Sequence, residues 1–391
     1  MPWKETCSMA LREEFVRLAS QEQANVRALC RRFEVSAKTA YKWLRRFREG
    51  GAAALGDRSR RPHESPTQTA EKIEQLVLDA RDQHPAWGGR KLRHWLLNRG
   101  VEDVPAASTI SQILKRHGRI DEAESAKHKA FKRFEHAAPN DLWQMDFKGH
   151  FELEDRSRCH PLTVLDDHSR FNLGLRACAN EQGTVVQQEL TTLFRRYGLP
   201  RRMLMDNGSP WGDDPEHPYT PLTVWLLRLG IGISHGRPYH PQTQGKDERF
   251  HRTFKAEVIS RGRFRNLADC QPQFDPWREV YNHERPHEAL DMGVPSSRYR
   301  VSERAFSEIL APLEYAPDCQ VRKVQHGGKM DFCGRTFRVG RAFRGYPLGL
   351  RPTTADGCWE VRFGWQVIGQ IDMREPSNTM TRPRPRKDAT T

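Results

Sequence analysis

The sequence lacks the cysteine patterns and the apolar runs that mark several protein classes. Its eight cysteines are scattered over 391 residues without a Cys-x-x-Cys pair, which supports neither a zinc knuckle nor a disulfide framework. The stretch PLTVWLLRLGIGIS is too short and interrupted for a membrane span, and the opening MPWKETCSMALREEF mixes acids and bases where a signal peptide needs an apolar run. We therefore expect a cytoplasmic protein that does not contact a membrane.

Acidic residues are too few to balance the basic ones. The chain has 64 Lys and Arg against 50 Asp and Glu, a formal net charge of +14. Such an excess favours a polyanionic partner, because Lys and Arg neutralise phosphates and release condensed counterions. Nucleic acid is the leading candidate, although charge alone fits a generally basic enzyme equally well.

Residues 25–51, NVRALCRRFEVSAKTAYKWLRRFREGG, have a helix-turn-helix pattern. Leu29 and Phe33 are spaced as one face of a first helix, and Ser36 can cap a second. The apolar residues of the second helix are Tyr41, Trp43, Leu44 and Phe47. The polar residues that could contact bases and phosphates in a major groove are Lys38, Thr39, Lys42, Arg45 and Arg46. The alternative interpretation is a basic module that binds another protein.

A second helical region follows the polar, proline-bearing stretch GDRSRRPHESPTQ. Residues 71–85, 88–100 and 105–118 form three amphipathic stretches, with Ser108 near the start of the last. This spacing predicts a second helix-turn-helix.

From residue 141 the pattern changes to short β-rich segments that alternate with helices, which predicts a mixed α/β fold. In LWQMDFKG the apolar residues alternate with Gln144, Asp146 and Lys148, so strand geometry puts Asp146 on the face opposite the aromatic residues. The stretch RRMLMDNGSPW is apolar up to Met205 and then turns. Asp206 therefore lies at a strand end, where α/β proteins commonly bind ligands.

The stretch HPQTQGKDERFHRTFK predicts a helix that starts near Gln244. Its buried stripe consists of Phe250, Phe254 and Val258. Glu248 lies about 200° from Phe250 around this helix and ranks ahead of Asp247, which points about 100° away from it. The basic residues near Glu248 that could hold a phosphate backbone are Lys246, His251, Arg252 and Lys255.

Asp146, Asp206 and Glu248 are separated by 60 and 42 positions, so only the fold could bring them together. Three gathered carboxylates would repel one another unless a cation compensated them. Oxygen ligands of this kind suit Mg²⁺, and two such ions could activate a nucleophile and stabilise the leaving oxygen at a phosphodiester. Taken singly, each acid could equally be a surface, turn or salt-bridge residue.

Five motifs in order resemble the retroviral-integrase-like core of bacterial insertion-sequence transposases over roughly residues 140–300: LWQMDFKG, TVLDDHSRF, MDNGSPW, HPQTQGKDERFHRTFK and YNHERPHEAL. The resemblance implies that Asp146, Asp206 and Glu248 are a D,D,E triad for two Mg²⁺ ions, with Mn²⁺ as a possible substitute. It also implies duplex DNA as partner, both the terminal inverted repeats of an element and a target, and a homo-oligomer that pairs the ends. Asp166 and Asp167 match a supporting position. The gap between Asp206 and Glu248 is longer than the family usually has, which predicts an extra loop at GDDPEHPYTP.

The expected fold class is multi-domain, with an α/β ribonuclease-H-like catalytic core preceded by all-α helix-turn-helix domains and followed by a small β-barrel. The expected boundaries are 1–55 and 69–118 for the helix-turn-helix domains, 56–68 and 119–140 for linkers, 141–300 for the core, 311–375 for the barrel and 376–391 for a basic disordered tail.

Two rival functions stay open beside a metal-dependent, nucleoid-associated transposase. One is a catalytically silent, transposase-derived regulator that binds DNA through its helix-turn-helix domains, against which the intact acids argue. The other is a nuclease of the ribonuclease-H type that acts on RNA:DNA hybrids, against which the DNA-reading N-terminal modules argue.

Overall fold

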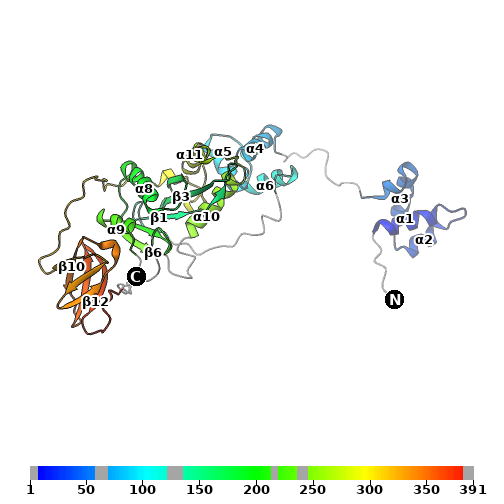
Figure 1. The fold of residues 1–391 in the computed structure, drawn as a ribbon. Helices are drawn as coiled ribbons and strands as arrows, with labels where there is room; N and C mark the ends of the chain where they lie inside the picture. Colours follow the sequence, from blue (N-terminus) through cyan, green and yellow to red (C-terminus); the bar gives the residue numbers. More distant parts are fainter. Residues whose placement is uncertain (1–7, 58–68, 121–134, 213–218, 236–244, 382–391) are drawn as a thin grey trace. The chain divides into compact units, whose positions relative to one another are not determined.

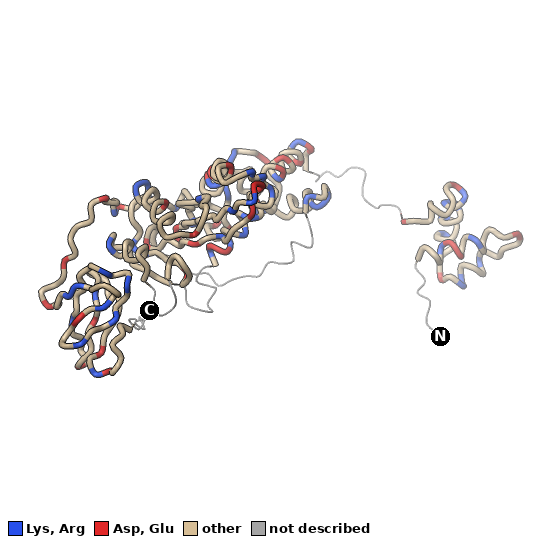
Figure 2. The backbone as a smooth tube through the Cα atoms, viewed as in Figure 1, with Lys and Arg blue, Asp and Glu red and all other residues tan. Residues whose placement is uncertain are grey.

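The computed structural model describes residues 8–57, 69–120, 135–212, 219–235 and 245–381 (Figure 1). The chain divides into two units, Met1–Gln68 and Thr69–Thr391, and each is described by itself. Lys and Arg are spread along both units with acids among them (Figure 2). Among the described residues, no helix combines the length and the apolar character that a membrane crossing requires.

The first unit is a small helical domain. Its helices are α1 (Ser8–Ala19), α2 (Val26–Arg32), α3 (Ala37–Gly50) and the 3-10 turn η1 (Ala52–Leu55). Ser36 caps α3 as predicted, because its hydroxyl accepts a hydrogen bond from the Thr39 N–H at 3.2 Å. Tyr41 does not pack with the other apolar residues of α3. Its side chain is 61% exposed, because Trp43 and Leu44 already fill the face of α3 toward the core.

The second unit begins with a second helical domain, α4 (Glu71–Gln83), α5 (Gly89–Asn98) and α6 (Ala107–Arg116). Gly89 permits close packing of α5 on α6, since an added Cβ would lie 2.4 Å from the Ala107 carbonyl oxygen. This domain packs on the domain that contains the mixed sheet. Glu284 of the core accepts hydrogen bonds from the Trp95 indole at 3.3 Å and the Arg99 guanidinium at 2.7 Å.

A mixed sheet forms the centre of the second unit. Its strands are β1 (Leu142–Phe147), β2 (Phe151–Glu152), β3 (Arg158–Asp166), β4 (Asn172–Cys178), β5 (Arg202–Met205) and β6 (Gly232–His235). The main path runs β4-β3-β1-β5-β6, with β2 added to one end of β3. The first three strands of this path pair antiparallel, and β5 and β6 pair parallel to β1. This topology is the ribonuclease-H-like fold.

Helices cover both faces of the sheet. On one face, α8 (Gly183–Tyr197) and α9 (Pro221–Arg228) pack on the aromatic and methionine residues of β1 and β5. On the other face lie α10 (Gly245–Phe254), the π-helical turn η3 (Lys255–Ile259) and α11 (Cys270–His283). The 3-10 turn η4 (Leu267–Asp269) precedes α11. Two further 3-10 turns, η5 (Glu288–Leu290) and η6 (Pro295–Ser297), follow it. The buried stripe predicted for α10, Phe250, Phe254 and Val258, is confirmed.

The packed core is longer than residues 141–300. Ser302 N–H donates to the Tyr197 carbonyl at 3.0 Å and Leu199 N–H to the Arg304 carbonyl at 2.7 Å, so the chain after 300 is held against the end of α8. At the other end, His136 N–H donates to the Asp167 carboxylate at 2.9 Å. Residues 121–134 of the expected linker lie outside the described residues.

The C-terminal region is all-β, as predicted. A sheet in the order β12-β11-β10-β7 and a ribbon of β8 and β9 share one hydrophobic core. The elements are β7 (Gln320–Lys323), β8 (Lys329–Phe332), β9 (Arg335–Arg338), η7 (Arg341–Phe343), β10 (Pro347–Pro352), β11 (Cys358–Phe363) and β12 (Gln366–Asp372). Part of the segment expected to be a disordered tail is ordered, because Thr379 and Thr381 bridge to β9 and β12. Residues 382–391 lie outside the described residues.

Candidate active site

The register of two parallel strands brings Asp146 and Asp206 together. β1 and β5 pair from Leu142 opposite Arg202 to Gln144 opposite Leu204, a constant offset of 60 positions. The same offset separates Asp146 from Asp206, which directly follows β5. The spacing seen in the sequence is therefore the strand register, and the two acids are neighbours at one end of the strand pair.

Burial raises the pKa of both acids. The Asp146 side chain is 26% exposed, and burial followed by the charge of Asp206 raises its pKa to about 7. Burial also raises the pKa of Asp206, although the Gly208 N–H donates to its carboxylate at 3.0 Å and opposes the rise. Both acids therefore lie where a cation would stabilise their ionised forms.

A fourth acid, Glu181, belongs to this neighbourhood and was missed by the sequence analysis. It lies between β4 and α8, and its charge contributes to the raised pKa of both Asp146 and Asp206. Its carboxylate also pairs with His160 of β3, 2.8 Å from Nδ1. Nothing in the local sequence, CANEQG, marks this residue, because its importance comes from the position of the loop after β4 near Asp146 and Asp206.

Glu248 and Arg252 are exposed on α10, and Lys255 is exposed at the start of η3. Arg249, the neighbour of Glu248, is also exposed. Among the described residues, no group of three or more His, Cys, Asp or Glu side chains is arranged to hold a metal ion. The structure thus brings two of the three expected acids together and leaves Glu248 outside such a group. The expected helix start at Gln244 and most of the expected extra loop lie outside the described residues, and α10 begins at Gly245.

His251 does not fit the DNA-contacting role expected from the sequence. It is 7% exposed, its Nε2 lies 2.8 Å from the Thr163 hydroxyl, and its Nδ1 lies 4.0 Å from the Asp146 carboxylate. Burial lowers its pKa to about 3, with a smaller contribution from Lys148, so the ring is neutral at physiological pH. A buried neutral ring cannot neutralise a phosphate, and His251 is removed from the expected set.

Lys246 is also used inside the protein. Its ammonium pairs with the carboxylate of Asp167, which is only 1% exposed in its side chain. Asp167 further accepts hydrogen bonds from the Gln144 amide at 2.6 Å and the His136 N–H at 2.9 Å. The pair ties the first turn of α10 to the segment after β3, so Lys246 positions the helix and does not serve as a free phosphate contact.

Replacing Lys246 with alanine is expected to lower the free energy of unfolding by about 3 kcal/mol, because it leaves a buried carboxylate without its cation. Urea denaturation of Lys246→Ala beside Lys255→Ala measures this, since Lys255 is exposed and its loss should change stability by less than about 0.5 kcal/mol. Equal stability of the two variants would contradict the internal role of Lys246.

The acids fit a hard divalent cation on chemical grounds. Asp146 and Asp206 offer carboxylate oxygens, the ligands that Mg²⁺ prefers. Asp247, next to Glu248, is 1% exposed, and neither of its carboxylate oxygens has a hydrogen-bond partner within the described residues. Buried carboxyl oxygens without hydrogen-bond partners are typical of a site that binds a cation.

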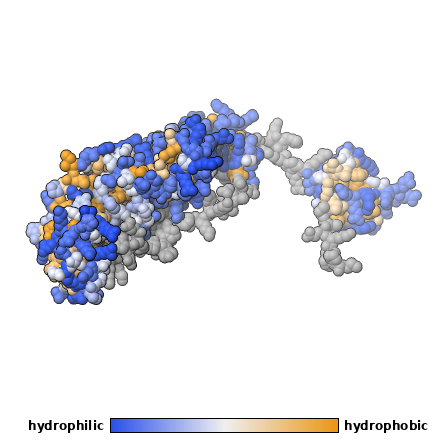
Figure 3. Space-filling view, in the orientation of Figure 1, coloured by the Kyte–Doolittle hydropathy of each residue, from blue (hydrophilic) through white to orange (hydrophobic). Residues whose placement is uncertain are grey.

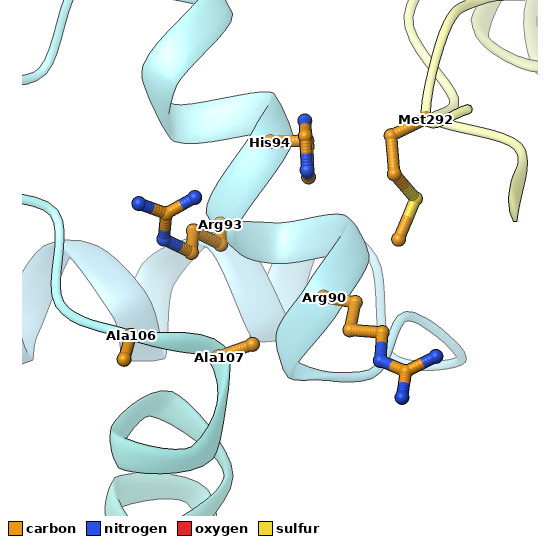
Figure 4. A pocket seen from close by; sticks show the side chains of 6 residues that line it. All are labelled: Arg90, Arg93, His94, Ala106, Ala107 and Met292. Carbon is orange, nitrogen blue, oxygen red and sulfur yellow. The ribbon is translucent and has the colours of Figure 1, made fainter.

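A separate cavity of about 360 Å³ lies at the seam between the second helical domain and the core (Figure 4). It is lined by Arg90, Arg93, His94, Ala106, Ala107 and Met292. His94 and Met292 face each other across it in Figure 4. None of the candidate catalytic acids lines this cavity. The visible face of the second unit is mostly hydrophilic (Figure 3), which fits a polar macromolecular ligand.

Comparison with protein-family models identifies five regions of the chain. Residues 136–241 and 229–295 match two integrase core domain models, and residues 319–379 match the C-terminal domain of IS481 family transposases. Residues 11–63 match a helix-turn-helix domain, and residues 39–114 match a homeodomain-like domain.

Two curated relatives come from insertion elements. The IS407 uncharacterized 31.7 kDa protein of Burkholderia multivorans is 27% identical over 177 residues, which cover 45% of this chain and 61% of that protein. The IS476 uncharacterized 39.2 kDa protein of Xanthomonas euvesicatoria is 26% identical over 243 residues, covering 61% and 67% respectively. The chain thus spans about three fifths of the first relative.

Two solved structures resemble this chain with low sequence identity and low TM-scores. The HTLV-2 integrase catalytic core domain in complex with magnesium is 14% identical, with a TM-score of 0.33, over 42% of this chain and 99% of that one. The simian T-cell lymphotropic virus intasome in complex with the PP2A regulatory subunit B56 gamma contains a chain that is 15% identical, with a TM-score of 0.36, over 80% of this chain and 100% of that one.

Proposed function

Because the chain has the domains of a bacterial insertion-sequence transposase with a retroviral-integrase-like core, we propose that it cleaves DNA at the ends of its element and transfers the 3′-hydroxyl ends to target DNA. The observation that carries the proposal is the β1–β5 register. It places Asp146 beside Asp206 in a region that matches an integrase core.

Asp146, Asp206 and Glu248 are the proposed catalytic residues. Asp146 and Asp206 would hold a divalent cation between neighbouring strand ends, and Glu248 would add the third carboxylate from α10. Bound Mg²⁺, or Mn²⁺ in its place, would supply Lewis-acid stabilisation of the attacking and leaving oxygens of the phosphodiester. The buried pair of Lys246 with Asp167 fixes the turn of α10 that carries Glu248.

The exposed face of α10 supplies the backbone contacts. Arg252 is exposed on the same helix as Glu248, and Lys255 is exposed at the start of η3, which continues it. Their charges would hold a DNA phosphate next to the reacting one. Placing the scissile phosphate in this way converts an encounter in solution into an oriented reaction.

The helix-turn-helix domains are proposed to bind the terminal inverted repeats. Lys38, Lys42 and Arg45 are exposed on α3, whereas Thr39 is half-buried and bonded to the Ser36 hydroxyl at 2.9 Å. Arg46 stacks on Trp43 at 4.8 Å, which gives it a packing role beside any contact with DNA. The C-terminal domain is proposed to bind DNA, and a homo-oligomer at the nucleoid of the cytoplasm is proposed to hold the paired ends.

Replacing Lys42 with alanine is expected to weaken binding to element ends and to lower the slope of log affinity against log salt concentration by about 1, because one phosphate contact is lost. A titration with labelled duplex at several salt concentrations measures both quantities. The control is Arg17→Ala, which removes an exposed charge from α1 and not from α3. An unchanged slope for Lys42→Ala would move recognition to the second helical domain.

A regulator that binds DNA without cutting it is the second candidate. The position of Glu248 favours it, since among the described residues this acid does not join Asp146 and Asp206 in a metal-holding group. Incubation of the purified protein with duplex that carries an element end, with and without Mg²⁺, separates the two functions. The transposase produces a metal-dependent nick that leaves a 3′-hydroxyl at the end of the element. The regulator produces a footprint and no nick.

A further inference from the structure

Asp247 is a buried acid for which the described residues offer no hydrogen-bond partner. Its side chain lies on α10 and is 1% exposed. Neither carboxylate oxygen has a hydrogen-bond partner within the part of the chain that the structure describes. Proteins rarely leave a buried carboxyl unsatisfied, and such a group points to a ligand or ion that completes it.

The face of α10 that carries Asp247 is directed at β1. His251 lies one helical turn further on, on the same face, and its ring comes within 4.0 Å of the Asp146 carboxylate. Asp247 is buried on this face and therefore lies on the side of α10 that packs toward β1 and Asp146.

Lys246, the cation next to Asp247 in sequence, already pairs with another acid. The Lys246 ammonium pairs with Asp167 and donates to its backbone carbonyl at 3.3 Å. Lys246 therefore does not compensate Asp247.

We infer that Asp247 is a positioning residue for the divalent cation held by Asp146, acting as a further acid outside the D,D,E set. A hard cation keeps several of its waters, and these donate hydrogen bonds. The Asp247 carboxyl can accept them from inside the protein, which would fix the cation against β1. The inference rests on the proposed function, because it requires that Asp146 hold a cation.

Asp247→Asn tests the role, because it keeps the shape of the side chain and removes the charge. Isothermal titration with MnCl₂ measures the dissociation constant for wild type, Asp247→Asn, Glu248→Gln and the control Asp356→Asn, an exposed acid of the C-terminal domain. The expected result is about 10- to 100-fold weaker Mn²⁺ binding by Asp247→Asn, the size of effect typical for residues that orient a metal site, with unchanged binding by the control. A metal-free Asp247→Val protein should also melt at a higher temperature than wild type, because it removes the buried unpaired carboxyl without introducing an unpaired amide.

Wild-type affinity in Asp247→Asn would overturn the inference and leave the proposed function standing, provided that Glu248→Gln binds Mn²⁺ weakly. Absence of Mn²⁺ binding by the wild type would overturn both. Should Asp247→Asn fail to fold, Asp247→Val takes its place, since valine suits a buried helix face. Weak Mn²⁺ binding by a folded Asp247→Val protein supports the inference, and wild-type binding contradicts it.

Discussion

Replacing Glu248 with glutamine is expected to reduce end cleavage and strand transfer by at least roughly 1000-fold, equivalent to about 4 kcal/mol of transition-state stabilisation. The change removes one proposed metal-holding carboxylate and no phosphate contact, so binding to element ends should stay within about twofold of wild type. Glu248 is exposed, and the substitution should leave stability unchanged. The measurement is the rate of single-turnover cleavage on an end duplex in Mg²⁺, beside a binding titration.

A matched control separates this effect from a general loss of negative charge. Glu303 is also exposed on the second unit, away from α10 in sequence, and Glu303→Gln should cleave at the wild-type rate. Full activity of Glu248→Gln would remove Glu248 from the proposed triad. Loss of DNA binding together with activity would show that Glu248 acts in binding and not in the chemical step.

Metal affinity is expected to fall steeply below neutral pH. Asp146 has a pKa of about 7 in the metal-free protein and must release its proton before it can hold a cation. Mn²⁺ affinity should therefore rise about tenfold for each pH unit up to pH 7 and level off above it, a gain of about 100-fold between pH 5 and pH 7. Asp206, whose pKa is also raised, would steepen the dependence.

The stability of the metal-free protein should change in the opposite direction. Because Asp146 holds its proton more tightly in the folded than in the unfolded chain, its contribution to stability is fully present below about pH 4 and is lost as pH rises to 7. A pKa of about 7 in place of 3.8 corresponds to a loss on the order of 4 kcal/mol. Adding Mn²⁺ at pH 7 should restore stability, and Asp146→Asn should remove both effects. If the melting temperature of Asp146→Asn depends on pH in the same way as that of the wild type, this account is contradicted.

Local periodicity predicts the elements that carry the site. The alternation in LWQMDFKG places Trp143 and Met145 in one core and leaves Asp146 outside it, as the structure shows. The stripe of Phe250, Phe254 and Val258 is buried for the same reason, because an amphipathic helix must bury its apolar face. The separation of 60 positions becomes informative only with the strand register, which depends on pairing between distant segments.

Angles around a helix are a poor guide to which polar residues face solvent. His251, Arg252 and Lys255 lie close to Glu248 in angle, yet His251 is buried and the others are exposed. The difference comes from Thr163 of β3, which offers His251 a hydrogen-bond partner in the interior. Lys246 is drawn inward in the same way by Asp167. The sequence of α10 alone carries no signal for either contact.

The sequence also does not reveal the exposure of Tyr41 or the importance of Glu181, for related reasons. Tyr41 is an apolar residue by type, but the packing face of α3 is filled by Trp43 and Leu44, and Tyr41 is left in solvent. Glu181 lies in a loop without a motif and becomes relevant only because the end of β4 lies near Asp146 and Asp206. Each of these outcomes depends on contacts made by elements far away in the sequence.

Strand transfer tests the central claim most directly. Duplexes that carry the element ends with exposed 3′-hydroxyls are incubated with purified protein, a circular target and Mg²⁺, and the products are sequenced across each junction. The account predicts covalent joints between the 3′ ends and target strands, none of them formed without metal or by Glu248→Gln. Tight binding to the ends with no joints in Mg²⁺ or Mn²⁺ would contradict it.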